Sequence, residues 1–285
     1  MKARPLGPED VEALCALVDA DRLPGQAPCT PERARTALAG RSTTDPWWWG
    51  ELATMRAIGV EDAGGTLVGA GAVARRRTGE RYLLWLHAGE VPEVVEAVLW
   101  PLLRGVRRPD PIFAFWSATE LAVGLEGLPH GHRPATHAAL LDRGFTGEDR
   151  WLYLTARAAC AAPTAAFRRR GHGAEVRVEL DVDGHSVGGA ELSLPAEGFG
   201  VIWWLEIEPE HRRRGLGRQL LRAARTVLVE EGVEDVVLFV DHDDPKTRDR
   251  RPALKLYEAE GFTVADHLWS YRRGGDAPPA ARPAG

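Results

Sequence analysis

The two halves of this 285-residue chain carry the same short motifs in the same order. Four pairs of strings share a separation of 117 to 119 residues: VGAGA at 68–72 with VGGAE at 187–191, LWL at 84–86 with WWL at 203–205, RGFT at 143–146 with EGFT at 260–263, and WLY at 151–153 with WSY at 269–271. Such a separation is longer than the repeats of solenoids and propellers, which run about 20–50 residues. The sequence therefore predicts two copies of one domain.

Composition narrows the class of protein. The chain has 36 basic and 41 acidic residues, a net charge of −5, and 44% hydrophobic residues, so it can bury a core and is a poor general binder of nucleic acid. No apolar run approaches the roughly 20 residues of a membrane helix, and the acidic start does not fit a secretory signal. The three cysteines, Cys15, Cys29 and Cys160, form no metal-ligand cluster. We expect a cytoplasmic bacterial protein without a metal.

The second copy has the clearer pattern of strands and helices. An Asp183-Gly184 turn between two β-rich runs indicates a hairpin, and apolar residues recur at helical spacing through 214–231. The expected strands are 175–182, 186–194, 201–207, 236–240 and 262–272, and the expected helices are 214–231 and 252–260.

The first copy repeats this order after two additional helices at 8–21 and 31–38. The elements that follow are a hairpin over 57–73, strands at 82–88, 112–116 and 145–154, and helices at 92–103 and 134–143. The predicted domains are residues 1–157 and 174–273, with a linker at 158–173 and a disordered tail at 274–285. The fold class is α/β (α+β).

Residues 205–221 contain the most informative motif. A strand ends, a basic loop follows, and Gly215 and Gly217 lie where a helix begins. Backbone N–H groups at a helix N-terminus bind anions, and glycine lets a phosphate approach the backbone. Arg212, Arg213, Arg214 and Arg218 add positive charge. The spacing fits neither the dinucleotide GxGxxG motif nor a P-loop.

These residues resemble the GNAT superfamily of acyl-CoA-dependent N-acyltransferases. RRRGLG at 212–217 fits the family's pyrophosphate loop, and LYEAEGF at 256–262 fits its later helix motif. The resemblance implies two tandem GNAT folds, each a mixed, mostly antiparallel central sheet flanked by helices.

The resemblance also implies roles for individual residues. The backbone at Leu205 and Ile207 would bind the acetyl-pantetheine arm, because the strand parts from its neighbour there, and Tyr257 would protonate the departing CoA thiolate. The expected pyrophosphate-binding residues are Arg212, Arg213, Arg214, Gly215, Leu216, Gly217 and Arg218.

The general base stays open. Relatives often use a glutamate early in the fourth strand, where this chain has Val201. Glu206 is the first candidate and Asp241 the second, and a chain of water molecules is an equal alternative.

The first copy departs from the family at the same places. By the offset of 119, its loop would be residues 93–98, which have no glycine and two carboxylates, and Leu140 stands where the second copy has Tyr257. We expect a degenerate domain that does not bind acyl-CoA. The second copy lacks the two helices that usually cover the acceptor site, so the first copy could supply that wall. Its candidate residues are the tryptophans at 47–49 and the histidines at 130 and 132, with the core and a loop as the plainer interpretations.

The sequence thus predicts an N-acetyltransferase that uses acetyl-CoA and acts on a small primary amine. A protein N-terminus or lysine is an alternative acceptor, and a non-catalytic acyl-CoA sensor is an alternative function. The expected partners are acetyl-CoA and the amine, with no nucleic acid or membrane, and the expected state is a monomer or homodimer.

Overall fold

The computed structural model describes residues 1–23, 25–105, 110–122, 125–171, 175–241 and 249–274. They form two compact units. The first unit contains Met1–Leu23, Pro28–Arg150 and the chain from His267 on, and the second contains Trp151–Asp266 with the described part of Pro24–Ala27. The tail expected to be disordered lies, from residue 275 on, outside the described residues.

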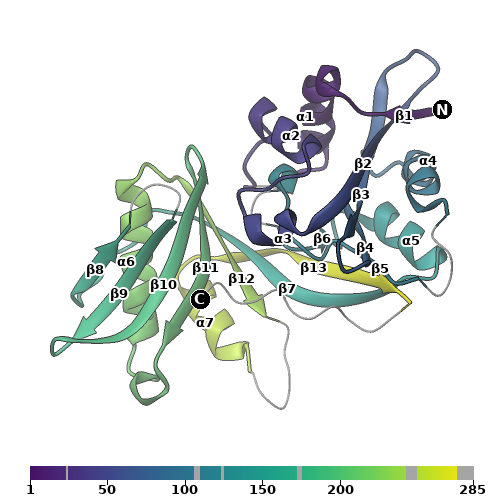
Figure 1. The fold of residues 1–285 in the computed structure, drawn as a ribbon. Helices are drawn as coiled ribbons and strands as arrows, with labels where there is room; N and C mark the ends of the chain where they lie inside the picture. The colour runs from purple at the N-terminus through teal and green to yellow at the C-terminus, as the bar shows by residue number, and fades with distance from the viewer. Residues whose placement is uncertain (24, 106–109, 123–124, 172–174, 242–248, 275–285) are drawn as a thin grey trace. The chain divides into compact units, whose positions relative to one another are not determined.

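The first unit is a mixed sheet with helices on both faces (Figure 1). Its strands are β1 (Lys2–Pro5), β2 (Leu52–Glu61), β3 (Leu67–Arg76), β4 (Arg81–His87), β5 (Ile112–Ala114), β6 (Leu128–Pro129) and parts of β7 (Thr146–Arg157) and β13 (Thr263–Arg273). Its helices are α1 (Val11–Ala20), α2 (Pro31–Leu38), α3 (Pro46–Gly50), α4 (Pro92–Leu103) and α5 (Pro134–Asp142), with 3-10 turns at Pro8–Asp10 and Glu120–Ala122. Helices α4 and α5 cover one face of the sheet, and α1 and α2 cover the other (Figure 1).

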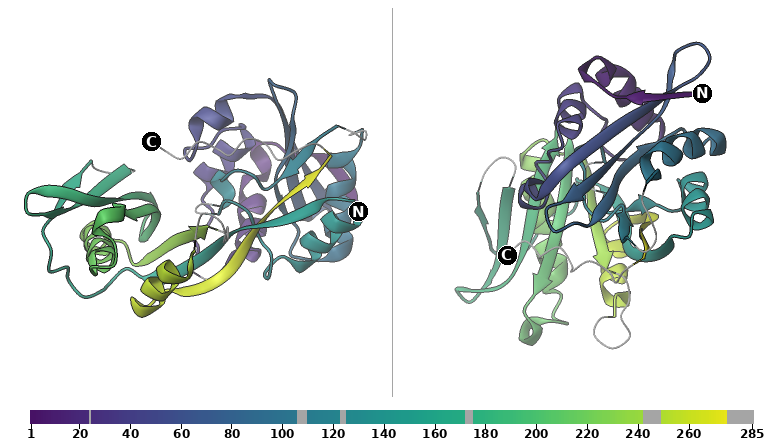
Figure 2. Two further views of the ribbon diagram at one scale, coloured as in Figure 1. Left: turned by 90° about the horizontal axis from the view of Figure 1, so that it is seen from below. Right: turned by 45° about the vertical axis from the view of Figure 1, so that its right-hand side comes forward.

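The second unit repeats the plan with fewer helices. Its strands are the rest of β7 and β13, β8 (Phe167–Arg170), β9 (Glu175–Val182), β10 (His185–Ala196), β11 (Phe199–Ile207) and β12 (Asp235–Asp241). Its helices are α6 (Leu216–Glu230) and α7 (Arg251–Ala259), after a 3-10 turn at Pro209–His211. Helix α6 lies against one face of the sheet (Figure 2), where Leu220, Ala224 and Leu228 are fully buried.

The two units have the same strand order, and in both of them most neighbouring strands are antiparallel. The first runs β1-β2-β3-β4-β5-β13 and the second β8-β9-β10-β11-β12-β7. The one parallel pair is β4 with β5 in the first and β11 with β12 in the second, among the described pairings. The prediction of two tandem folds with mixed, mostly antiparallel sheets is confirmed.

Each unit takes its sixth strand from the other copy of the repeat. From Trp151 on, β7 of the first copy belongs to the second unit and pairs with β12. From His267 on, β13 of the second copy belongs to the first unit and pairs with β5. Tyr271 on that strand is fully buried in the first unit's core. The units therefore differ from the predicted domain ranges at both closing strands.

Two further segments add to the predicted elements. Strand β8 falls inside the stretch expected to be a linker; its Arg168 and Arg170 pair with carboxylates on the neighbouring strand. In the tryptophan run, Trp48 and Trp49 are buried in the first unit's core and Trp47 is exposed. No helix among the described residues is long and apolar enough to cross a membrane.

Candidate functional site

The basic loop between β11 and α6 has the backbone geometry of an anion site. Arg213 and Gly215 both adopt left-handed conformations, with φ of 64° and 77°, and Gly215 is the N-cap of α6. Across the described chain, no other backbone carbonyl accepts from the N–H groups of residues 213–217. Helix starts leave such donors unsatisfied, and their dipole favours negative charge.

Gly217 joins three parts of the second unit. A Cβ atom added there would lie 3.3 Å from Leu256 of α7 and 4.0 Å from Ile207 at the end of β11. The helix start therefore packs tightly against the residue next to Tyr257. The absence of a side chain at Gly217 thus serves packing as well as access to the backbone.

Strand β11 parts from β12 beside this loop. Their parallel pairing ends at Ile202 with Leu238, although β12 continues to Asp241 along β7. The other edge of β11 stays paired with β10 as far as Ile207. In the described chain, residues 203–207 thus offer one edge that β12 does not cover, and such an edge can bond an extended ligand. The parting expected near Leu205 is present.

Arg212 ties the loop to the strand end. Its Nε donates to the carbonyl oxygen of Ile207 at 2.8 Å, and its Nη2 lies 2.8 Å from Oε1 of Glu206. Arg212 is thereby held by protein groups. Arg213 and Arg214 have no carboxylate partner in the part of the chain that the structure describes, so they remain available for an anion.

Tyr257 is buried, with 8% of its surface exposed, and its ring meets Phe262 edge-on with centroids 5.9 Å apart. Its hydroxyl has no hydrogen-bond partner among the residues described. Burial raises the pKa of Tyr257 to about 12. The phenol therefore keeps its proton at neutral pH, as a hydrogen-bond donor to a leaving group must.

The two candidate bases lie on the two strands that part. Glu206 is half exposed and is engaged by Arg212, so its visible role is to hold the loop. Asp241 ends β12, opposite Trp151 of β7. The choice of base among Glu206, Asp241 and water stays a prediction.

The loop also gathers three possible metal ligands. Ligand atoms of Glu208, Glu210 and His211 lie within 4.8 Å of one another, all on exposed or half-exposed side chains. Clusters of this kind are common without an ion, and the prediction of no metal stays untested.

The first unit differs from the second at the segment between its fourth strand and the following helix. The loop position expected there from the offset of 119 is wrong. Residues 93–98, expected to form the loop, lie inside α4. The connection from β4 to α4 is residues 88–91, whereas β11 and α6 are joined by residues 208–215. The loop of the first unit therefore has Gly89 and a single carboxylate, Glu90, and it is too short to form the same cradle.

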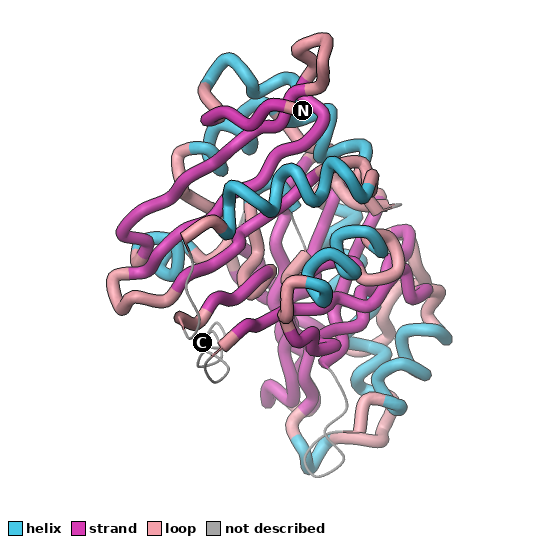
Figure 3. The backbone as a smooth tube through the Cα atoms, turned by 90° about the vertical axis from the view of Figure 1, so that its right-hand side faces the viewer, coloured by secondary structure: helices cyan, strands magenta, loops and turns pink. Residues whose placement is uncertain are grey.

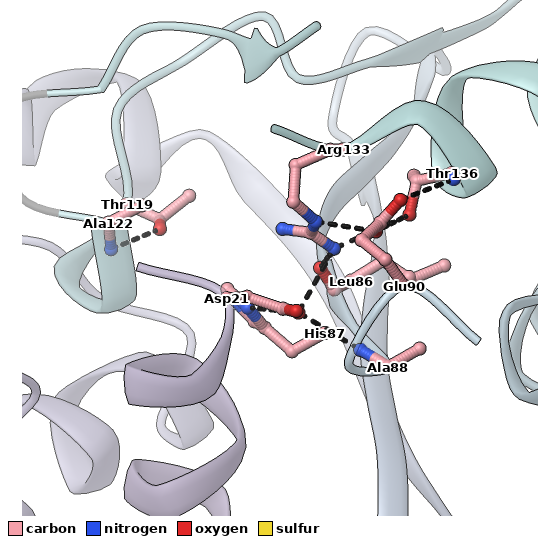
Figure 4. Close-up of polar contacts among 9 residues, drawn as sticks. All are labelled: Asp21, Leu86, His87, Ala88, Glu90, Thr119, Ala122, Arg133 and Thr136. Carbon is pink, nitrogen blue, oxygen red and sulfur yellow. Dashed lines mark hydrogen bonds and ion pairs between the residues drawn. The ribbon is translucent and has the colours of Figure 1, made fainter. Parts of the chain in front are cut away.

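A buried network of charges fills this region of the first unit (Figure 4). The guanidinium of Arg133 lies between two carboxylates, with Nη2 3.2 Å from Asp21 and Nε 2.6 Å from Glu90. Asp21 also accepts from the N–H of Ala88 and contacts His87 at 3.2 Å. Burial lowers the pKa of His87, so the imidazole is neutral at pH 7.

Glu90 in turn caps helix α5. Its carboxylate accepts from the N–H groups of Ala135 and Thr136 at 2.8 and 3.0 Å, and from the Thr136 hydroxyl at 2.6 Å (Figure 4). A carboxylate at a helix N-terminus is favourable, and here it satisfies backbone donors in the first turn of α5. Sequence patterns did not indicate this network, because its members are far apart along the chain.

The fold and the second unit's loop are of the GNAT type. Residues 144–262 match the Acetyltransferase (GNAT) family. A tandem GNAT protein from the clavulanic acid biosynthesis pathway has the same fold, with a TM-score of 0.63 and 15% identity over 97% of this chain and 99% of that one. A GCN5-related N-acetyltransferase from Sphaerobacter thermophilus gives 0.58 and 16% over 97% of both chains.

Curated relatives extend the similarity at the sequence level. A mycothiol acetyltransferase from Clavibacter michiganensis subsp. michiganensis is 31% identical over 170 residues, which is 55% of this chain and 51% of the relative. Another from Corynebacterium aurimucosum is 37% identical over 74 residues, 25% of this chain and 22% of the relative. The chain thus matches about half or less of the length of these relatives.

Proposed function

We propose that the chain is an acetyl-CoA-dependent N-acetyltransferase whose chemistry takes place in the second unit. One observation carries the proposal. Left-handed backbone at Arg213 and Gly215 opens the donors of a helix start toward an anion, directly beside the uncovered edge of β11. A phosphate-bearing thioester with an extended arm is the ligand that matches both features.

In this mechanism, different parts of the second unit bind the pyrophosphate, the pantetheine arm and the leaving sulfur. The loop N–H groups with Arg213 and Arg214 hold the pyrophosphate, and the edge of β11 at Leu205 and Ile207 holds the pantetheine arm. Tyr257 donates a hydrogen bond to the sulfur as the thiolate leaves. A phenol with a pKa of about 12 is a weaker acid than an ordinary thiol at about 8.5, so this hydrogen bond rather than early proton transfer is its contribution.

The proposed acceptor is a primary amine of a small molecule. We place the enzyme in the cytoplasm, as a monomer or homodimer. Some curated relatives are named mycothiol acetyltransferase, so the acceptor of those enzymes is the first amine to assay. This chain nevertheless has Val201 where many family members have a glutamate. Protein N-termini or lysines are the alternative acceptors. The first unit, with its short loop and filled charge network, is proposed not to bind acyl-CoA.

The test is amine-dependent release of CoA thiol from acetyl-CoA, followed across a panel of amines. Arg213→Glu with Arg214→Glu should raise the KM for acetyl-CoA by at least about tenfold, since two attractive charges become repulsive ones. Arg41→Glu, an exposed arginine of the first unit, is the matched control and should leave KM unchanged. Binding of acetyl-CoA without thiol release for any amine would favour the sensor function. Calorimetry that counts two CoA sites per chain would contradict the role given to the first unit.

A further inference from the structure

The first unit has a groove of about 390 Å³ that the proposed reaction does not use. Four arginines line it, each from a different element: Arg56 of β2, Arg75 of β3, Arg81 of β4, and Arg104, which ends α4. The strands run past the end of α4 on the face that this helix covers (Figure 3). The groove lies there, beyond the last turn of the helix.

The floor of the groove is apolar. Leu102 and Ile112 are buried members of the first unit's core, and Val73 packs against that core. Small-ligand sites combine such an apolar lining with a few convergent polar groups in volumes of about 300–1,000 Å³. The groove has both features.

The positive charge on its rim is only partly compensated. Nη2 of Arg56 donates to the carbonyl oxygens of Pro101 and Leu102 at 2.7 and 3.3 Å, so this arginine caps the C-terminus of α4. Arg81 lies 3.6 Å from Asp110. Within the described ranges, Arg75 and Arg104 are exposed and have no ion pair. Of the four arginines, only Arg81 thus has a carboxylate partner among the described residues.

The groove is separate from the place equivalent to the acyl-CoA loop. Strand β4 begins at Arg81, in the groove, and ends at His87, in the buried charge network. The two regions thus lie at opposite ends of one strand.

We propose that this groove binds an organic phosphate monoester with a hydrophobic body. Guanidinium groups pair with phosphate oxygens in a bidentate manner, which suits the rim formed by Arg75 and Arg104. The apolar floor at Leu102 and Ile112 takes the aromatic or aliphatic part. Inorganic phosphate would use the rim alone, and an uncharged aromatic alcohol the floor alone.

The test uses 1-naphthyl phosphate as a fluorescent probe on the full chain carrying Arg213→Glu and Arg214→Glu. That background removes the competing anion loop of the second unit and makes the result independent of the proposed reaction. The naphthyl ester should bind at least about tenfold more tightly than inorganic phosphate or 1-naphthol, because it uses rim and floor together. Adding Arg75→Ala and Arg104→Ala should weaken its binding at least about tenfold.

Arg35→Ala with Arg41→Ala, two exposed arginines of the same unit outside the groove, forms the matched control and should not change binding. All variants should unfold at the same temperature, since the exchanged side chains are exposed. Naphthyl phosphate binding that equals that of inorganic phosphate would overturn the proposal. So would binding that survives the loss of Arg75 and Arg104.

Discussion

Arg133 donates a hydrogen bond from Nη2 to the carbonyl oxygen of Leu86 at 2.8 Å. Leu86 occupies in the first copy the position that Leu205 occupies in the second, where the pantetheine arm is proposed to bind. The first unit thus provides its own side-chain donor where the second unit would receive a ligand. This donor supports the proposal that the first unit does not bind acyl-CoA.

Replacing Arg133 by leucine should strongly destabilise the first unit. The arginine is 4% exposed, and its removal leaves the carboxylates of Asp21 and Glu90 without their cation. Breaking a buried ion pair from one side costs about 3–5 kcal/mol. Urea unfolding of the full chain measures the loss. Arg143→Leu is the control, because its partner Glu96 is half exposed, and it should change the unfolding free energy much less. Equal effects of the two changes would mean that the network adds nothing.

The same network should make the first unit sensitive to acid. Burial raises the pKa of Asp21, but the contacts with His87 and Arg133 outweigh it, so that pKa lies below its usual value. The pKa of His87 is also lowered, by burial. As pH falls below about 6.5, His87 becomes protonated in the unfolded chain but stays neutral in the folded chain. The free energy of unfolding therefore falls by up to about 1.4 kcal/mol per pH unit. Asp21 adds a second loss below about pH 4.

His87→Asn isolates this contribution, since asparagine can keep a donor toward Asp21 and does not titrate. Unfolding free energies measured between pH 7 and 5 should fall less steeply in the variant than in the original chain. The difference between the two slopes is the quantity to compare, because the pKa of His137 is lowered as well. Equal slopes of unfolding free energy against pH in the two proteins would mean that groups other than His87 cause the acid sensitivity.

The strand exchange gives a third prediction. Tyr271→Ala should destabilise the first unit, although Tyr271 belongs to the second copy of the sequence repeat. Tyr271 is fully buried beside Phe115 and donates to or accepts from Nδ1 of His137 at 2.8 Å. Truncating a large buried aromatic side chain costs about 3–5 kcal/mol. Hydrogen exchange should accelerate in β4 and α4 while β10 and β11 keep their protection. Faster exchange in β10 and β11 instead would show that β13 stabilises its own copy.

The elements of the fold followed from local patterns, and their assembly did not. The Asp183-Gly184 turn and the apolar stripe of α6 specify a hairpin and a helix from a few neighbouring residues, and both are present. The exchange of β7 and β13 depends on which sheet edge each strand meets, and no local pattern encodes that.

The site divides in the same way. Gly215 and Gly217 indicated, from the sequence alone, a helix start whose backbone a phosphate can approach, and Gly215 is the N-cap of α6. The contacts by which Arg212 joins Glu206 to Ile207, and the shortened loop at Glu90, are visible only in the folded protein. A constant offset between the copies cannot detect the shortened loop, because other segments of the first copy are longer and compensate for the missing residues.

Tyr257→Phe separates catalysis from binding in the second unit. The hydroxyl has no partner among the described residues, so its removal should leave folding and acetyl-CoA affinity unchanged. Loss of a positioned hydrogen-bond donor to the charge that develops on the sulfur lowers the rate by about 10²-fold or more. Because burial raises the pKa of Tyr257 to about 12, the hydroxyl stays protonated across the working range. The ratio of the two kcat values should therefore be the same at pH 7 and at pH 9.5. A ratio that shrinks toward pH 9.5 would mean that Tyr257 ionises early, and an unchanged kcat would exclude it as the hydrogen-bond donor to the sulfur. Phe262→Leu, which alters the ring beside the tyrosine but keeps the hydroxyl, should retain most of the rate and serves as the control.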